Sequence, residues 1–157
     1  MKFRVEREVL AEALGAAARV ASTRNNAMPA LSGVKLEVTG DQLTLSCTDN
    51  DLSVQFVLPV GGQADGVVVA SAKLLSDIVR AGAEGKVTFE SAGEEVHISS
   101  GRAQTTVATF AASDFPHIAL ASAPPVTLSA PLLGEALRQV VRAASSDMQR
   151  LPLTGVL

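Results

Sequence analysis

Residues 1–21 read MKFRVEREVLAEALGAAARVA and contain two different hydrophobic periods. Apolar and polar residues alternate over 1–6, which is typical of a β-strand with one buried face. In the rest of the stretch the apolar residues recur at helical spacing, with Leu10, Leu14 and Ala17 on one face and charged residues opposite. We therefore expect a strand that runs directly into an amphipathic helix.

The same order of elements is predicted a second time further along the chain. After the helix and a polar loop, short segments with period-two alternation are joined by Gly, Asp or Asn, which predicts hairpin-linked strands over 31–39, 41–48 and 52–60. Residues 65–85 predict another strand and helix, with a helix stop at Gly82 or Gly85. Three further strands are expected over 86–91, 94–100 and 103–110. The pattern indicates an α+β fold in which a strand-helix-strands unit occurs twice.

The end of the chain repeats part of its beginning. Residues 151–157, LPLTGVL, are similar to PALSGVKL at 29–36. A shift of 123 positions also places Leu10 on Leu133, in the same apolar phase. The repeat predicts that a second module begins near the end of this chain.

This repeat suggests the domain organisation. We expect a first domain over 1–120, a linker over 121–125 and the start of a second domain over 126–157. The linker region contains small residues and paired prolines, which suit a connection between domains. The last segment is expected to hold one strand, one helix and the beginning of a returning strand, which is too little to complete a module. The chain is therefore predicted to be a fragment or a truncated relative of a longer protein.

The composition indicates the cellular compartment in which the protein works. The single cysteine, Cys47, cannot form an internal disulfide, and the amino terminus lacks the apolar centre of a signal peptide. We therefore expect a cytoplasmic protein. No apolar run approaches the roughly 20 residues that span a bilayer, so no membrane partner is predicted.

The net charge of −3 argues against a nucleic-acid partner, but the distribution of charge does not. Acidic residues are concentrated on the predicted strands and hairpin turns. Eight of the thirteen basic residues lie in or beside predicted helices, namely Arg7, Arg19, Arg24, Lys73, Arg80, Arg138, Arg142 and Arg150. The helices and the sheet are therefore expected to face different surroundings.

The sequence carries no motif that indicates an enzyme. His97 and His117 are its two histidines, and neither has a Cys or a second His at metal-ligand spacing. GAEGKV at 82–87 lacks the full phosphate-loop pattern, and DNDLS at 49–53 lacks the glycine and the distant glutamate of a calcium loop. We interpret these segments as a helix stop and a hairpin connection, and we predict no catalytic residue, cofactor or metal.

The sequence resembles the bacterial sliding-clamp family, the beta subunit of DNA polymerase III. The similarity is carried, in order, by MKFRVERE, PALSGVKLEV, LSCTDNDLSV, SDIVRAGAEG, SGRAQTTVATFAASDFP and LPLTGVL, and extends along all 157 residues. It implies a DNA clamp fold with helices on one face of the sheet. It also implies three modules in a full-length chain, and two chains that pair head to tail into a ring whose helices line the hole.

The resemblance implies a processivity factor that tethers the replicative polymerase to double-stranded DNA and has no catalysis of its own. The polymerase and the clamp loader subunits are then expected partners. A ring that slides should attract phosphates diffusely, because tight base-specific contacts would stop its movement. The candidate DNA-binding residues are Arg24, Lys73, Arg80, Arg138, Arg142, Gln149 and Arg150.

Some of these candidates also have simpler interpretations. Arg138 and Arg142 are one helical turn apart and could form a solvated face, with Glu135 as a partner for Arg138. Lys73 near a helix start gains nothing from the macrodipole, which favours anions there, so an outside phosphate explains it better. Some relatives have aromatic side chains where Leu151 and Pro152 stand, and no stacking role is predicted for these two residues.

The resemblance also implies a subunit interface on the second helix and the strand over 103–110. Its candidate residues are Ile78, Arg102, Thr105 and Val107, because an exposed strand edge with apolar neighbours is a template for pairing with another sheet. The alternative hypothesis is a truncated clamp-like interaction module that binds a clamp interface and regulates ring assembly.

Overall fold

The computed structural model describes residues 1–21, 28–118, 124 and 126–156, and Arg24 lies outside them. The chain divides into two compact units, Met1–Ala119 and Leu120–Leu157, and each is described by itself. Within the described residues, no helix has the length and hydrophobicity that a membrane crossing requires.

The first unit consists of two halves with the same order of elements. The first half contains β1 (Lys2–Glu6), α1 (Arg7–Val20), a 3-10 turn η1 (Pro29–Ser32), β2 (Gly33–Thr39), β3 (Gln42–Thr48) and β4 (Ser53–Pro59). The second contains β6 (Gly66–Ser71), α2 (Ala72–Ala81), β7 (Lys86–Ala92), β8 (Glu95–Ser100), β9 (Ala103–Phe110) and η2 (Ala112–Asp114). The predicted strand-helix-strands pattern is confirmed. The short strand β5 (Gly61–Ala64) between the halves was not predicted, because GGQA has no apolar alternation.

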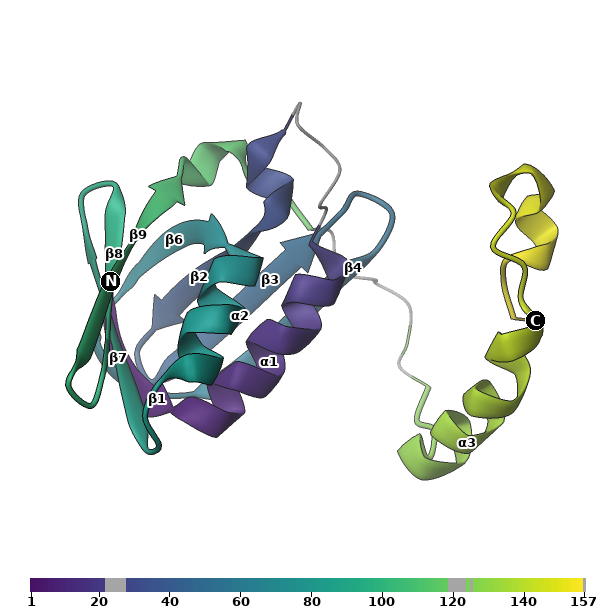
Figure 1. The fold of residues 1–157 in the computed structure, drawn as a ribbon, viewed down its shortest axis with the longest axis horizontal. Helices are drawn as coiled ribbons and strands as arrows, with labels where there is room; N and C mark the ends of the chain where they lie inside the picture. Colours follow the sequence, from purple (N-terminus) through teal and green to yellow (C-terminus); the bar gives the residue numbers. More distant parts are fainter. Residues whose placement is uncertain (22–27, 119–123, 125, 157) are drawn as a thin grey trace. The chain divides into compact units, whose positions relative to one another are not determined.

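The strands form one antiparallel sheet in the order β4-β3-β2-β6-β9-β8-β7-β1-β5. The first strand of each half pairs with a hairpin strand of the other half, so that β1 lies beside β7 and β6 beside β2. The two halves therefore interlock instead of folding separately. Helices α1 and α2 lie side by side on one face of the sheet (Figure 1).

The core lies between the two helices and the sheet. Leu10 and Leu14 of α1 and Leu75 of α2 are fully buried against strand residues. Phe3 and Phe89, opposite one another in the β1–β7 register, stack with ring centroids 5.1 Å apart. Burying an aliphatic or aromatic side chain of this size contributes roughly 1.5–3 kcal/mol, so the apolar stripes of the helices hold both helices on the sheet.

The segment DNDLS at 49–53 is a hairpin connection, as predicted. The Asp49 Oδ1 atom accepts hydrogen bonds from the backbone N–H groups of Asp51 and Leu52, at 3.1 and 2.8 Å. Asn50 adopts a φ of 81°, in the left-handed region that Asn tolerates better than most residues. The Asp49 carboxylate therefore shapes this turn.

The described residues of the second unit form helical segments joined by irregular stretches. It contains α3 (Ala130–Val140) and two 3-10 segments, η3 (Val141–Ala143) and η4 (Met148–Leu153). The predicted helix is confirmed, whereas the strands expected around Val126 and over 152–157 are wrong. A strand requires a neighbour to receive its backbone hydrogen bonds, and the described part of this unit contains no other strand.

Candidate nucleic-acid interface

Helix α2 places charged side chains on the face opposite the core. Lys73, Asp77 and Arg80 follow one another at helical spacing and are exposed, while Leu75 and Val79 on the other side are buried. The helix begins where the Ser71 Oγ accepts from the Leu74 backbone N–H at 3.4 Å, and it ends before Gly82, one of the two stops that were predicted. Capping and burial together fix the direction in which these charges point.

Helix α1 lies against α2 and contributes a second charged ridge. Glu12 and Arg19 are exposed on it, opposite Leu10 and Leu14. Gly15 lies where the helices meet, and a Cβ atom there would come within 3.3 Å of the Arg80 Nη2. The Arg80 guanidinium therefore reaches across to α1. Arg19 was not among the site residues predicted from the sequence. Its helical spacing from Glu12 places both residues on the same exposed face and could have identified it.

The lysines on the strands are paired with carboxylates. Nζ–Oε distances are 2.9 Å for Lys2–Glu90, 2.8 Å for Lys35–Glu37 and 3.7 Å for Lys86–Glu6. Opposite charges on neighbouring strand positions stabilise a sheet modestly, so these lysines have a structural explanation.

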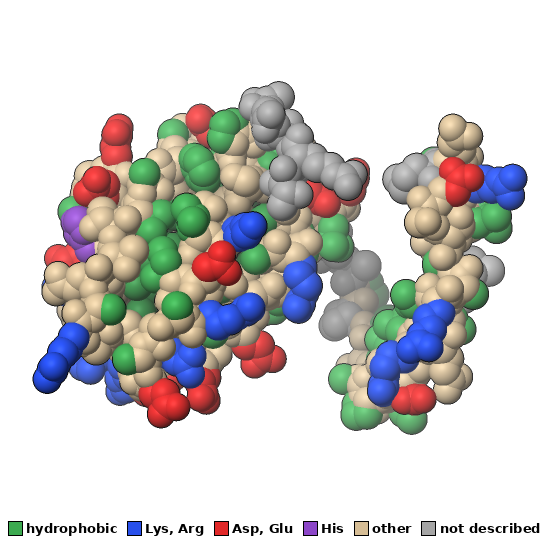
Figure 2. Space-filling model, in the orientation of Figure 1, with side chains coloured by type: hydrophobic (Ala, Val, Ile, Leu, Met, Phe, Trp, Pro, Cys, Tyr) green, Lys and Arg blue, Asp and Glu red, His purple; other side chains and the backbone are tan. Residues whose placement is uncertain are grey.

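The cations on the outer helix face differ from these strand lysines. Within the described residues, Arg19, Lys73 and Arg80 have no carboxylate oxygen within 4.0 Å. Figure 2 shows Lys and Arg side chains over α1 and α2, with acidic side chains among them. These three cations are therefore free to meet an anion from outside the molecule.

Arg7 has a structural role. Its Nη1 donates to the Arg80 backbone carbonyl at 3.3 Å, and its Nη2 lies 3.7 Å from a Glu8 carboxylate oxygen. A cation beside the last-turn carbonyls of α2 is favoured by the helix dipole. Arg7 thus stabilises the end of α2.

The candidates of the second unit are mostly engaged locally. The Arg138 Nη2 lies 2.7 Å from a Glu135 carboxylate oxygen, which confirms the predicted pairing of Arg138 with Glu135. The Arg150 Nε lies 3.8 Å from Asp147, and the Gln149 backbone N–H donates to the same carboxylate group at 3.0 Å. Arg142 is exposed and has no ion pair within the described residues.

Two of the interface candidates lie together on the first unit. Ile78 and Thr105 line a hollow of about 200 Å³ between α2 and the β8–β9 hairpin, and Arg102 is exposed in the turn of that hairpin. Val107 differs from them, because it is only 7% exposed and belongs to the hydrophobic core. Its side chain is therefore accounted for by the fold.

One edge of β9 is open over most of its length. The strand pairs with β8 from Ala103 to Ala108, but it pairs with β6 only at Thr109 and Phe110. Among the described residues no strand covers the second edge before Thr109. Such an edge presents backbone donors and acceptors to another chain.

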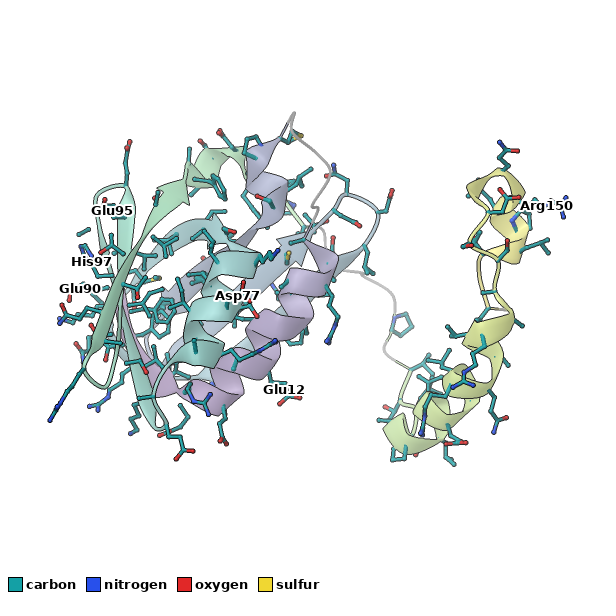
Figure 3. All side chains as sticks on the ribbon, viewed as in Figure 1. Glu12, Asp77, Glu90, Glu95, His97 and Arg150 are labelled. Carbon is teal, nitrogen blue, oxygen red and sulfur yellow. The ribbon has the colours of Figure 1, made fainter. Side chains whose placement is uncertain are left out.

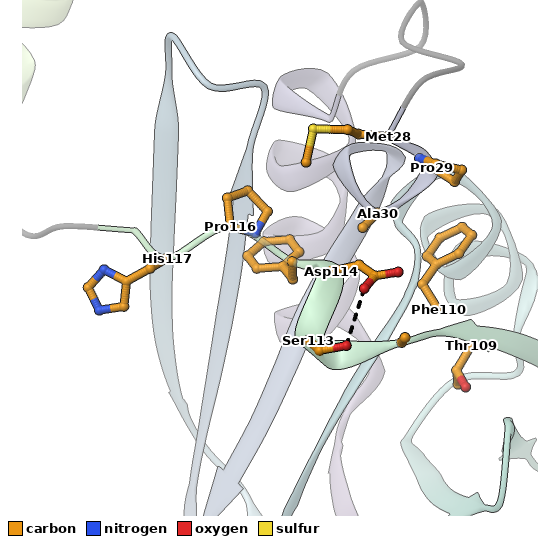
Figure 4. A pocket seen from close by; sticks show the side chains of 11 residues that line it. Met28, Pro29, Ala30, Thr109, Phe110, Ser113, Asp114, Pro116 and His117 are labelled. Atoms are coloured by element: carbon orange, nitrogen blue, oxygen red, sulfur yellow. Dashed lines mark hydrogen bonds between the residues drawn. The ribbon is translucent and has the colours of Figure 1, made fainter.

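A second hollow, of about 920 Å³, lies between η1 and η2 (Figure 4). Met28, Phe110 and Phe115 provide apolar lining, and Asp114 accepts a hydrogen bond from the Ser113 hydroxyl at 3.2 Å. None of the candidate DNA-binding or interface residues within the described part of the chain lines it.

The described residues contain no group of three or more His, Cys, Asp and Glu side chains that could hold a metal ion. Cys47 is fully buried, and burial raises the pKa of its thiol to about 11, which disfavours the reactive thiolate. His97 is exposed on β8, with its Nδ1 2.9 Å from the Thr106 hydroxyl oxygen. The site geometry therefore supports charge recognition on a helix face, by side chains that are held in place by the core.

The matching family model describes the N-terminal domain of the DNA polymerase III beta subunit, and it covers residues 1–119. The chain belongs to this family. Two beta sliding clamps are similar over 99% of the chain, at 32% identity for the protein of Micrococcus luteus and 35% for that of Streptomyces coelicolor. The solved beta clamp of Caulobacter crescentus superposes with a TM-score of 0.89 at 28% identity, again over 99% of the chain.

The chain covers only part of these members of the beta subunit family. It spans 50% of the Micrococcus luteus protein, 41% of the Streptomyces coelicolor protein and 42% of the solved Caulobacter crescentus chain. The resemblance to clamp sequences and the clamp fold of the first unit are thus confirmed, whereas the assignment of individual residues to DNA or to a subunit interface stays a prediction.

Proposed function

We propose that this chain is part of a DNA sliding clamp, a non-catalytic subunit that tethers the replicative DNA polymerase to its duplex template. The observation that carries the proposal is the pairing of the strand lysines and the absence, within the described residues, of a carboxylate partner for Arg19, Lys73 and Arg80. Membership in the beta subunit family supports it.

The outer face of α1 and α2 would contact the DNA backbone. Long, exposed Lys and Arg side chains attract phosphates as point charges and can exchange one phosphate for the next, with water between them. Binding of this kind depends on salt and carries no base readout, so the clamp moves along the duplex while remaining attached. Arg24, Arg138, Arg142, Gln149 and Arg150 are proposed as further contacts from the remainder of the chain.

A second copy would meet the first unit at the open edge of β9. Ile78 and Thr105 would supply apolar contact beside the edge, Arg102 would supply a polar contact at the hairpin turn, and the backbone of β9 would extend the sheet across the interface. In a full-length chain this contact would close a head-to-tail ring. The polymerase and the clamp loader are the proposed protein partners of that ring.

The first prediction concerns DNA. The full 157-residue chain, titrated with a short duplex at about 10 mM salt, should bind weakly and without sequence preference, because the Debye length is then about 30 Å. Each phosphate contact removed by Lys73→Ala or Arg80→Ala should lower the slope of log affinity against log salt by about 0.9. NMR titration of amide shifts gives both the affinity and the residues involved.

The matched control for the Lys73→Ala with Arg80→Ala double variant also removes two positive charges, but from the strands. Lys2→Ala with Lys86→Ala removes two paired lysines and should leave the salt slope close to that of the unchanged chain. Equal loss in the helix and strand variants would show that only net charge matters, and the helix face would then be the wrong site.

A further inference from the structure

Glu12 and Asp77 occupy the same position in the two halves of the first unit. Each is the sixth residue of its helix, since α1 starts at Arg7 and α2 at Ala72. The alignment that relates them also places Leu10 on Leu75, both fully buried. Figure 3 labels Glu12 on α1 and Asp77 on α2. The two halves therefore present a carboxylate at equivalent points of the outer helix face.

Two neighbouring positions related by this alignment do not share their charge. Glu8 corresponds to Lys73, and Gly15 corresponds to Arg80. The carboxylate is thus retained where neighbouring positions of the two halves differ.

The fold itself does not account for these two carboxylates. Within the described residues neither has a basic group within 4.0 Å, and neither caps a helix. The helix dipole favours acids in the first turn only, and both residues lie beyond it. Asp is also a poorer helix former than Glu or Ala in a helix interior. Neither a close ion pair nor a helix cap therefore explains an acid at either place.

Both carboxylates lie among the unpaired cations of the same face. Asp77 stands between Lys73 and Arg80 on one ridge of α2, four residues after the first and three before the second. Glu12 is one turn before Gly15, against which the Arg80 guanidinium lies. Any phosphate that approaches Arg80 also approaches these two negative charges, which repel it.

We propose that Glu12 and Asp77 weaken the attraction of the helix face for DNA phosphates and so keep the contact loose enough for sliding. This inference rests on the proposed function, because it concerns the same face. Two unit charges about 10 Å apart in water interact by about 0.4 kcal/mol, roughly a twofold change in affinity for each carboxylate before screening. The two together are therefore expected to lower the affinity severalfold at low salt.

The test replaces both acids without changing their shape. Glu12→Gln with Asp77→Asn in the full chain should bind a short duplex about three- to fivefold more tightly at about 10 mM salt, and the gain should shrink as salt shortens the Debye length. Glu94→Gln with Glu95→Gln removes two exposed acids at the β7–β8 turn and is the control for net charge. It should change the affinity by less than about twofold.

The outcomes separate this inference from the proposed function. If Lys73→Ala with Arg80→Ala weakens binding but the Glu12 and Asp77 pair gives no more gain than the turn control, the inference is overturned and the helix face remains the DNA site. If the Lys73 and Arg80 pair also has no effect, or if the chain does not bind the duplex, the proposed function fails and the inference fails with it.

Discussion

At the scale of single residues, the basic side chains fall into two groups. Those of the first group form ion pairs within the fold, and those of the second have no close partner and are available to a ligand. Lys2 belongs to the first group, because it is paired with Glu90 on the neighbouring strand. Arg80 belongs to the second, since its guanidinium lies over Gly15 with no carboxylate oxygen within 4.0 Å in the described part of the chain. Lys2 and Arg80 thus differ in whether a carboxylate lies close enough to form an ion pair.

Cys47 allows a prediction about pH. Burial raises its pKa from 9.0 to about 11, so folding favours the protonated thiol. At pH 8 alkylation in the native protein should be about 100-fold slower than in urea, because reactivity follows the thiolate fraction. This ratio of alkylation rates should hold below pH 9 and disappear as the pH rises through about 11. The contribution of the protonated thiol to the free energy of unfolding should be lost over the same pH range. Equal rates at pH 8, measured by mass spectrometry, would contradict it.

At the scale of elements, the first unit is held together by exchange of strands between its halves. The β1–β7 and β6–β2 pairs bring residues that are distant in the sequence into register, for example Phe3 with Phe89 and Leu36 with Val68. Each half pairs its own three hairpin strands, and the exchanged strands β1 and β6 join each set to the other half. The short strand β5 extends this arrangement by pairing with β1 at the edge of the sheet.

The strand β5 depends on a glycine at its second position. A Cβ atom at Gly62 would collide with the backbone carbonyl of Gly40, whereas one at Gly61 would meet no atom closer than 3.7 Å. Gly62→Ala should therefore destabilise the chain by about 2 kcal/mol or more, because backbone must move, and Gly61→Ala should change stability by less than about 1 kcal/mol. Urea unfolding measures both. Equal stability of the two variants would show that the Gly40 turn can move freely.

At the scale of the whole molecule, the two units differ in how much they bury. The first has a continuous core that includes Phe3, Leu36 and Phe89. No described residue of the second is buried, and Leu133, Leu137 and Val140 of α3 remain 39–44% exposed. The apolar face of α3 is thus uncovered within its own unit.

Limited proteolysis should reflect this difference. Local opening requires little free energy where few apolar contacts are lost, so the second unit should be cleaved readily while the first resists. Mass spectrometry should detect a stable fragment that contains residues 1–118. The melting temperature of that fragment should be close to that of the first unit in the full chain. A full chain that resists the protease along its whole length would contradict the prediction.

The sequence by itself determined the order of strands and helices in the first unit and the buried faces of α1 and α2. These features follow from local periods, such as the spacing of Leu10 and Leu14, which any part of the chain carries alone. Resemblance to a family added the clamp fold. The tertiary structure decided the pairing of β1 with β7, the burial of Val107 and the absence of a carboxylate oxygen within 4.0 Å of Arg80 among the described residues. These depend on which distant residues become neighbours, and period and composition do not encode that choice. The strands expected beyond Val126 failed for the same reason, because a strand exists only with a partner beside it.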